Sequence, residues 1–177
     1  MHYRRAHVPG ATYFFTLNLA NRNLSLLVDN IVTLKNSINR VKTAHPFEIV
    51  AMAVLPDHLH AVWTLPPDDA DFATRWALIK AGFSRCLPKA ERISESRKSK
   101  GERGIWQRRY WEHLIRDDDD LARHIDYIHY NPVKHGYVSR AADWPHSSIH
   151  RFILNGIVSA DLASDANPAG DGWGERS

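Results

Sequence analysis

The sequence predicts an α+β domain built on a ferredoxin-like (RRM-like) antiparallel sheet. Three observations support this fold class. Short runs of aromatic and β-branched residues alternate with amphipathic segments, their order is strand, helix, strand, strand, helix, strand, and a two-residue turn separates the middle strands. This order places both helices on one face of the sheet. A further helix near the C-terminus, which carries Tyr127, is then free to cover the other face.

The first half of the chain supplies three of the expected strands. Residues 13–19 are rich in aromatic and β-branched side chains and are typical of a strand. Residues 31–42 carry apolar side chains at spacings of three and four, which predicts an amphipathic helix. Residues 47–55 and 58–65 are expected to pair as a hairpin, because the Pro-Asp pair between them favours a tight turn.

The second half supplies the remaining elements. The apolar spacing of residues 72–87 predicts the second helix. Residues 91–109 hold seven Lys and Arg against three Glu and are expected to form a mobile loop, while residues 106–115 are expected to form the fourth strand. The acidic residues 117–120 suit the start of the tyrosine-bearing helix, because its dipole favours negative charge there. Asn131-Pro132 is expected to end that helix.

Length and composition exclude several classes of protein. The 177 residues suit one domain, expected over residues 1–158, followed by a polar and flexible tail over 159–177. The chain is 44% hydrophobic and 24% charged, which excludes wholesale disorder. Its net charge of +3 permits a polyanionic partner. The single cysteine, Cys86, excludes an internal disulfide and a multi-cysteine zinc site.

The sequence also bears on location. The chain contains no apolar run of the roughly 18 residues that a membrane span needs. Its first residues, Met-His-Tyr-Arg-Arg, lack the apolar segment of a signal peptide. We therefore expect a soluble cytoplasmic protein that does not bind a membrane.

Two histidines in the third predicted strand form a candidate metal half-site. Since side chains alternate along a strand, His58 and His60 project from one face while Leu59 projects from the other. Two imidazoles held on one rigid face can bind a divalent metal. Taken alone the pattern is weakly specific, and it favours the alternative of two solvent-facing histidines on a half-exposed strand.

A second candidate lies about seventy residues later, on the last predicted helix. Tyr127 and Asn131 are four residues apart, so they share one side of that helix. The pair could place a phenol beside a metal that also takes an amide oxygen. The alternative is a packed aromatic residue followed by a helix cap, and the helix by itself favours this alternative.

Taken together, these motifs and their flanking segments resemble the HUH single-tyrosine transposases. The similarity is closer to the REP-associated tyrosine transposases, which are associated with repetitive extragenic palindromes. It spans about residues 3 to 150, and the ordered set is far more specific than any one motif. The segments that carry it are Tyr3-Arg4-Arg5, Phe14-Phe15-Thr16-Leu17-Asn18-Leu19, Pro56-Asp57-His58-Leu59-His60, Trp63-Thr64-Leu65-Pro66, Trp106-Gln107-Arg108-Arg109-Tyr110-Trp111-Glu112-His113, Tyr127-Ile128-His129-Tyr130-Asn131-Pro132-Val133-Lys134 and Asp143-Trp144-Pro145.

The resemblance implies a mechanism and a substrate. It implies that His58, His60 and Asn131 hold Mg²⁺ or Mn²⁺ and that Tyr127 is the nucleophile. The mobile-element branch usually has Gln at the position of Asn131. The implied reaction is nicking and strand transfer on single-stranded DNA beside a palindromic hairpin, through a 5′-phosphotyrosine. A nucleoid-associated monomer is expected, with a dimer that exchanges the tyrosine helix as the alternative.

Basic residues that could hold the DNA lie at the N-terminus, in the 91–109 segment and after the tyrosine. Trp106 and Tyr110 stand among these arginines, and such interleaving suits single strands, whose unpaired bases need a stacking surface. An ordinary solvated loop with core aromatic residues explains the composition equally well. The candidate DNA-binding residues are Arg4, Arg5, Lys98, Lys100, Arg103, Arg108, Arg109 and Lys134.

Two other functions remain open on the sequence. The chain could be a catalytically inactive nucleic-acid-binding module in which the histidines and the tyrosine have structural roles. It could also be a metallohydrolase in which bound water attacks the substrate and Tyr127 takes no part.

Overall fold

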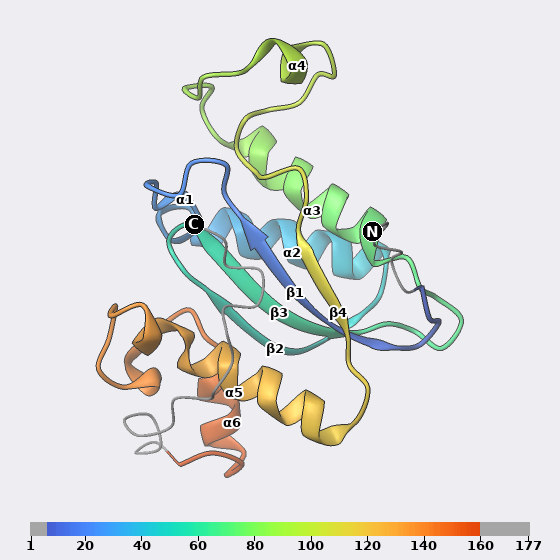
Figure 1. Ribbon diagram of the computed structural model, residues 1–177, viewed down its shortest axis with the longest axis vertical. Coiled ribbons are helices and arrows are strands. Elements are labelled where there is room, and N and C mark those ends of the chain that lie inside the picture. Colours follow the sequence, from blue (N-terminus) through green and yellow to red (C-terminus); the bar gives the residue numbers. More distant parts are fainter. Residues whose placement is uncertain (1–6, 160–177) are drawn as a thin grey trace, which may run out of the picture.

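The computed structural model describes residues 7–159 and shows an α+β fold (Figure 1). The four strands pair in the order β2-β3-β1-β4, and every pair is antiparallel. This is the predicted ferredoxin-like order. The elements in chain order are β1 Thr12–Asn18, α1 Leu26–Asp29, α2 Ile31–Ala44, β2 Glu48–Val54, β3 His58–Thr64, α3 Phe72–Cys86, α4 Glu95–Lys98, β4 Trp111–Leu114, α5 Asp118–Lys134, the 3₁₀ turn η1 Ala141–Asp143 and α6 Ile149–Leu154.

The sheet separates two apolar layers. Helices α2 and α3 pack against each other on one face, and Trp63 of β3 stacks on Trp76 of α3 there with ring centroids 3.9 Å apart. Helix α5 lies on the opposite face, where Tyr127 and Ile128 pack on Phe14 and Val62 (Figure 1). The predicted distribution of helices over the two faces is therefore confirmed.

The turn between β2 and β3 is fixed on several sides. The backbone N–H of Leu55 donates to the carbonyl of His58 at 2.8 Å, which closes the two-residue turn. The carbonyl of Asp57 in this turn accepts from the N–H of Leu19, just after β1, also at 2.8 Å. The first residue of β3, which is His58, therefore starts from a rigid position.

Helix α5 is longer than predicted, because Pro132 does not end it. A proline lacks one N–H and so removes a single helical hydrogen bond, and the chain continues helically to Lys134. The helix ends where the N–H of Tyr137 donates to the carbonyl of Pro132 at 3.0 Å and Gly136 adopts a φ of 72°. This is a Schellman ending, and the glycine provides the left-handed residue that it requires.

The fourth strand is shorter than the predicted 106–115 segment. Thr16 of β1 pairs with Trp111 and Leu19 pairs with Trp106. Between these two pairings β1 advances three residues while its partner goes back five, so two extra residues bulge out and interrupt the ladder. Only β4 remains as a regular strand.

The chain after α5 covers the outer edge of β2, and its elements η1 and α6 were not predicted. Ser147 forms a bridge with Ala53, and the N–H of Ser148 donates to the carbonyl of Met52 at 2.8 Å. These contacts occupy groups that an open strand edge would expose. The predicted tail over residues 159–177 lies, apart from Ser159, outside the described residues. No helix in the described part of the chain is long and apolar enough to cross a membrane.

His129 on α5 makes the stability of this fold depend on pH. Burial lowers the pKa of His129 to about 4, with a contribution from nearby Arg151, and the ring bonds Ser148 Oγ through Nε2 at 2.9 Å. The unfolded chain takes up this proton below about pH 6.5, whereas the folded chain does not do so until about pH 4. His129 should therefore cost about 3 kcal/mol of stability as the pH falls through this window.

Urea unfolding of wild type and His129→Gln at pH 7.5, 5.5 and 4.5 measures this effect. The variant should lose less stability between pH 7.5 and 4.5 than the wild type, because it has one fewer group to titrate. His45→Gln, which changes an exposed histidine at the end of α2, is the control and should keep the wild-type slope. Equal slopes in wild type and His129→Gln would show that His129 does not titrate in this window.

Candidate active site

The two histidines of β3 lie on the face of the sheet that α5 covers. Their neighbours Leu59 and Trp63 point the other way and belong to the core beneath α2 and α3. The His58 and His60 rings lie 5.1 Å apart between centroids. The predicted alternation is confirmed, and both imidazoles stand on a central strand that is paired on both sides.

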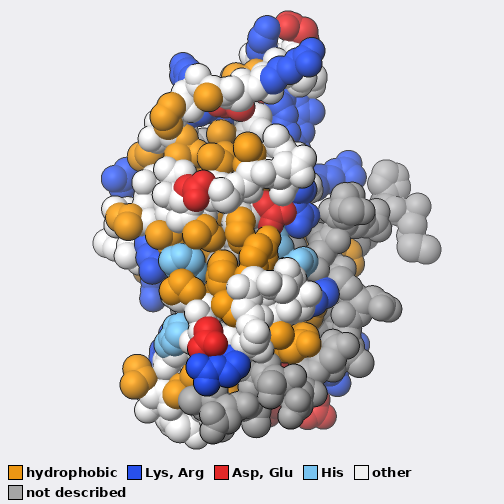
Figure 2. Space-filling view, turned by 90° about the vertical axis from the view of Figure 1, so that its left-hand side faces the viewer, with side chains coloured by type: hydrophobic (Ala, Val, Ile, Leu, Met, Phe, Trp, Pro, Cys, Tyr) orange, Lys and Arg blue, Asp and Glu red, His pale blue; other side chains and the backbone are white. Residues whose placement is uncertain are grey.

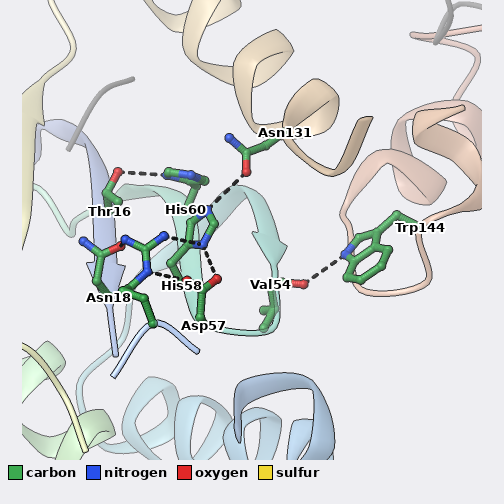
Figure 3. A network of polar contacts seen from close by, with 9 residues as sticks. Thr16, Asn18, Val54, Asp57, His58, His60, Asn131 and Trp144 are labelled. Atoms are coloured by element: carbon green, nitrogen blue, oxygen red, sulfur yellow. Dashed lines mark hydrogen bonds and ion pairs between the residues drawn. The ribbon is translucent and has the colours of Figure 1, made fainter. Parts of the chain in front are cut away.

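Tyr127 and Asn131 approach this pair from α5. The Tyr127 ring lies 5.3 Å from the His60 ring, and Asn131 Oδ1 lies 3.3 Å from His58 Nε2 (Figure 3). None of the four residues is more than 1% exposed. The structure thus brings together two segments that are about seventy residues apart in the sequence.

Asp57 and Arg22 orient the His58 ring. Asp57 Oδ1 lies 2.8 Å from His58 Nδ1, closer than Arg22 Nη2 at 3.3 Å. Because an ionised carboxylate only accepts, this shorter contact favours a proton on Nδ1. Arg22 Nε donates to the other carboxylate oxygen, and its Nη1 donates to Asn18 Oδ1 at 3.0 Å (Figure 3). Burial alone would raise the pKa of Asp57, but the hydrogen bonds from His58 and Arg22 hold it at about 2. Asp57 is therefore ionised at neutral pH.

His60 is held in a similar way from β1. Its Nδ1 lies 2.8 Å from Thr16 Oγ1, directly across the strand pair (Figure 3). In metal sites, a partner on one ring nitrogen fixes the ring so that the other nitrogen coordinates. Both histidines thus have the outer-shell support that is typical of metal ligands.

The donor atoms of the cluster suit a divalent cation. With a proton on Nδ1, the His58 ring can offer the lone pair of Nε2 to a metal, and that atom faces Asn131 Oδ1, which also only accepts, at 3.3 Å. Neighbouring ligands of an octahedral Mg²⁺ ion lie about 3 Å apart, since each bond is about 2.1 Å long. The residues present therefore fit the predicted set of two imidazoles and one amide oxygen.

Lys134 lies over Tyr127 at the end of α5. Its ammonium donates to Tyr127 Oη at 3.2 Å and stands 4.8 Å from the centre of the ring. Lys134 is exposed, whereas Tyr127 is buried. The hydroxyl of a buried tyrosine thus meets a positive charge at the surface, which stabilises an oxyanion on that oxygen.

The other candidate DNA-binding residues that the structure describes lie outside this site. Arg4 and Arg5 lie outside the described residues. Lys98 and Arg108 pair with Glu95 and Glu102 at the surface, and Lys100 and Arg109 are exposed. Figure 2 shows Lys and Arg side chains gathered at the top of the molecule, where α4 lies in Figure 1.

Arg103 has a structural role within the 91–109 segment. It donates to the carbonyl oxygens of Leu87 and Pro88 at 2.8 and 2.7 Å, and it pairs with Glu91. These contacts attach the segment to the end of α3. The segment was predicted as a loop, but it contains α4 and is anchored at Arg103.

The two aromatic residues singled out in this segment pack inward. Trp106 is 5% exposed and contacts Phe83, and Tyr110 packs edge-on against Phe15 in the core beneath α2 and α3. Their packing therefore supports a role in the core rather than a role as a stacking surface for DNA bases.

A second cluster with metal-ligand chemistry lies near the start of α5. His113, Asp120 and His124 place ligand atoms within 4.8 Å of one another. Asp120 Oδ2 already accepts from the backbone N–H and from Nε of Arg116, both at 3.1 Å, and bonds His113 Nε2 at 2.9 Å. Burial would raise the pKa of Asp120, but the bonds from Arg116 and His113 outweigh it and hold this pKa well below its usual range. The cluster ties α5 to β4 through a carboxylate that is already satisfied.

The sequence alone did not assign a role to three residues of the site, which are Asp57, Arg22 and Thr16. The signal for Asp57 was its place in the turn immediately before His58. Thr16 and Arg22 had no such signal. Thr16 meets His60 through the pairing of β1 with β3. Arg22 meets Asp57 and His58 from the turn that follows β1, so only the folded chain brings it to the site.

Comparisons with known proteins identify the family of this chain. Residues 9–131 match a family described as IS200-like transposases. A REP-associated tyrosine transposase of Escherichia coli is 44% identical over 163 residues, which are 92% of this chain and 91% of the relative. A Haemophilus influenzae protein, described as a "Putative REP-associated tyrosine transposase", is 48% identical over 160 residues, 90% of this chain and 91% of the relative. A solved structure of a REP-associated tyrosine transposase bound to a REP hairpin is 42% identical, with a TM-score of 0.85 over 100% of this chain and 98% of that one.

Proposed function

Because this chain belongs to the IS200-like transposase family, among its REP-associated tyrosine transposases, we propose that it cleaves and rejoins single-stranded DNA beside REP hairpins. Support for the hairpin substrate comes from the solved relative, which is bound to one. Support for the chemistry comes from one observation in this chain, the convergence of Tyr127 on His58, His60 and Asn131. The metal, its ligands and the phosphotyrosine are the parts of the proposal that experiment must test.

Tyr127 is the nucleophile in this proposal. Its Oη loses a proton and attacks the phosphorus of a DNA phosphodiester, so that an Oη–P bond forms and the bond from phosphorus to the 3′ oxygen breaks. The released 3′ oxygen takes up a proton, and the 5′ phosphate remains on Tyr127. A second 3′-OH reverses these steps and rejoins the strands without ATP, because the phosphotyrosine conserves the energy of the broken bond.

His58, His60 and Asn131 would hold Mg²⁺ or Mn²⁺ through two imidazole nitrogens and one amide oxygen. When bound, the cation supplies charge neutralisation at the phosphate and polarises phosphorus towards attack. The nitrogen ligands should bind Mn²⁺ more tightly than Mg²⁺. Asp57 and Thr16 keep the two rings in position for this role.

Lys134 would assist the nucleophile directly. Its ammonium is within hydrogen-bond distance of Tyr127 Oη, where negative charge develops when the proton leaves. Because the side chain is also exposed, the same charge can meet an incoming phosphate. Lys134 thereby acts on both reacting groups.

Two further features follow from the geometry. One chain brings its own Tyr127 to its own histidine pair, which supports a monomer rather than a dimer that exchanges α5. The four central residues are buried, so the chain must open at this site before a phosphate can reach the phenol.

The test of the proposal uses a labelled DNA hairpin with a palindromic-repeat stem and a short single-stranded flank. The full chain is incubated with it in Mg²⁺ or Mn²⁺, and the products are separated under denaturing conditions. A covalent protein–DNA product and a free 3′-OH strand are the expected result. Hairpin binding without cleavage would favour the inactive binding module, and cleavage without any covalent product would favour the metallohydrolase.

Replacing the carboxylate that orients His58 should weaken metal binding. Asp57→Asn keeps the size of the side chain but removes the charge that holds the proton on Nδ1. Loss of such a partner typically lowers metal affinity by about 10- to 100-fold. Calorimetric titration with Mn²⁺ measures the change, with Asp143→Asn, which removes a surface pair with Arg140, as the control. Unchanged Mn²⁺ affinity in Asp57→Asn would contradict the orienting role.

A further inference from the structure

Trp111 is an exposed indole on the same face of the sheet as the histidine pair. Trp111 and Thr16 are directly paired across β4 and β1, and Thr16 is paired in turn with His60 across β1 and β3. Directly opposed residues share a face of the sheet. The hydrogen bond from Thr16 to His60 marks this as the face that carries the candidate active site. Glu112, the next residue, points the other way and is 4% exposed.

The position of Trp111 relative to the reacting groups follows from the sheet. It stands two strands away from His60, which at the usual strand spacing is about 10 Å. Helix α5 packs mainly over β2 and β3 and meets β4, the opposite edge of the sheet, at its own start, where Asp120 bonds His113. Trp111 is 42% exposed, in contrast to the packed Trp106 and Tyr110. A substrate strand that reaches Tyr127 from the β4 side would cross this indole.

We propose that Trp111 is a stacking surface for an unpaired nucleobase of the substrate strand, close to the cleaved phosphodiester. The proposal rests on the proposed function, since it takes the substrate to be single-stranded DNA beside a hairpin. Bases inside a hairpin stem are stacked on one another, so only a base outside the stem can offer its face to an indole. The site is therefore one for the single-stranded flank and not for the stem.

The chemistry of an indole distinguishes this contact from those of the basic residues. Stacking of a base on an aromatic side chain is tolerant of sequence, because every base has a π face. It releases no counterions, whereas contacts of Lys and Arg with phosphates make the affinity fall with salt. Trp111 should thus contribute to affinity without contributing to its salt dependence.

The experiment measures equilibrium binding of three labelled DNAs without added metal: the bare hairpin, the hairpin with a 5′ flank and the hairpin with a 3′ flank. Trp111→Ala should weaken binding of one flanked hairpin by about 5- to 100-fold and leave the bare hairpin within twofold. The slope of log affinity against log salt should not change. An abasic site at one flank position should produce the same loss in wild type, and Trp111→Ala should add nothing to it.

Two further variants make the result specific. Trp111→Phe keeps an aromatic face and should recover most of the affinity for the flanked hairpin. Leu78→Ala removes a side chain of similar exposure, 39%, from α3 on the opposite face and should have no effect. Thermal unfolding of each variant checks that the fold is kept.

The possible failures are distinguishable. If wild type binds the flanked hairpin more tightly than the bare one and Trp111→Ala binds like wild type, the stacking site is wrong and the proposed function stands. An equal loss for bare and flanked hairpins would also overturn the stacking site. If wild type binds no hairpin at all, both proposals are overturned.

Discussion

Tyr127→Phe is expected to abolish the covalent protein–DNA product and to lower the rate of strand cleavage by at least about 10³-fold. The substitution removes one oxygen atom, the one that would form the bond to phosphorus. The ring still fills its place against Phe14 and His60, so the packing of α5 on the sheet should be kept. Hairpin affinity should therefore stay close to that of wild type.

Tyr130→Phe provides a matched control. It makes the same chemical change on the same helix, at a half-buried position about 60° from Tyr127 around the helix axis. It should cleave and form the covalent product at the wild-type rate. Cleavage that survives in Tyr127→Phe would mean that water is the nucleophile, and a covalent product in that variant would assign the reaction to another residue.

Replacing both histidines should separate cleavage from binding. His58→Ala with His60→Ala removes two of the three proposed ligands, so cleavage in Mg²⁺ or Mn²⁺ should fall to background. Hairpin affinity should remain within a few fold, because contacts with phosphates dominate the binding of nucleic acids. A gel-shift titration and a cleavage assay on the same preparation measure the two effects.

The double variant needs a check of its fold, since it removes two buried side chains that bond Asp57 and Thr16. His58→Asn with His60→Asn keeps polar groups at both positions and should show the same loss of cleavage. His45→Ala on the far side of the sheet is the control. Mn²⁺ titration should show binding to wild type and to His45→Ala and none to either double variant. Cleavage that persists in a folded double variant would refute the metal site.

The fold was largely predictable because it depends on local patterns. Alternation in β3 separates the two histidines from the side chains that face α2 and α3, and the three- and four-residue spacing in α2 reflects its one buried face. Both predictions are confirmed. The errors arose where tertiary contacts or a later residue decide the outcome. The pair Asn131-Pro132 is typical of a helix end, yet α5 continues past it and ends at Gly136. The bulge before β4 depends on the pairing of Trp106 with Leu19, which no local pattern shows.

The site was less predictable than the fold. Alternation placed His58 and His60 on one face, but nothing in their spacing relates them to Tyr127, and that link came from the resemblance to a family. Thr16 carries no local signal because strand pairing brings it to His60, and Arg22 carries none because the turn after β1 brings it to Asp57 and His58. Trp111 was passed over in favour of Trp106 and Tyr110, since the face that each aromatic residue occupies depends on the register of β4 against β1.

The enclosure of Tyr127 bears on how a cell could tolerate such an enzyme. Single-stranded DNA appears at every replication fork, and in the proposed reaction a permanently accessible phenol could cleave any of it. With the phenol 1% exposed, a random encounter has no reacting group to meet. In the proposed reaction, a ligand must supply the binding energy that opens the site, so selectivity would depend on the shape of the bound DNA as well as on its base sequence.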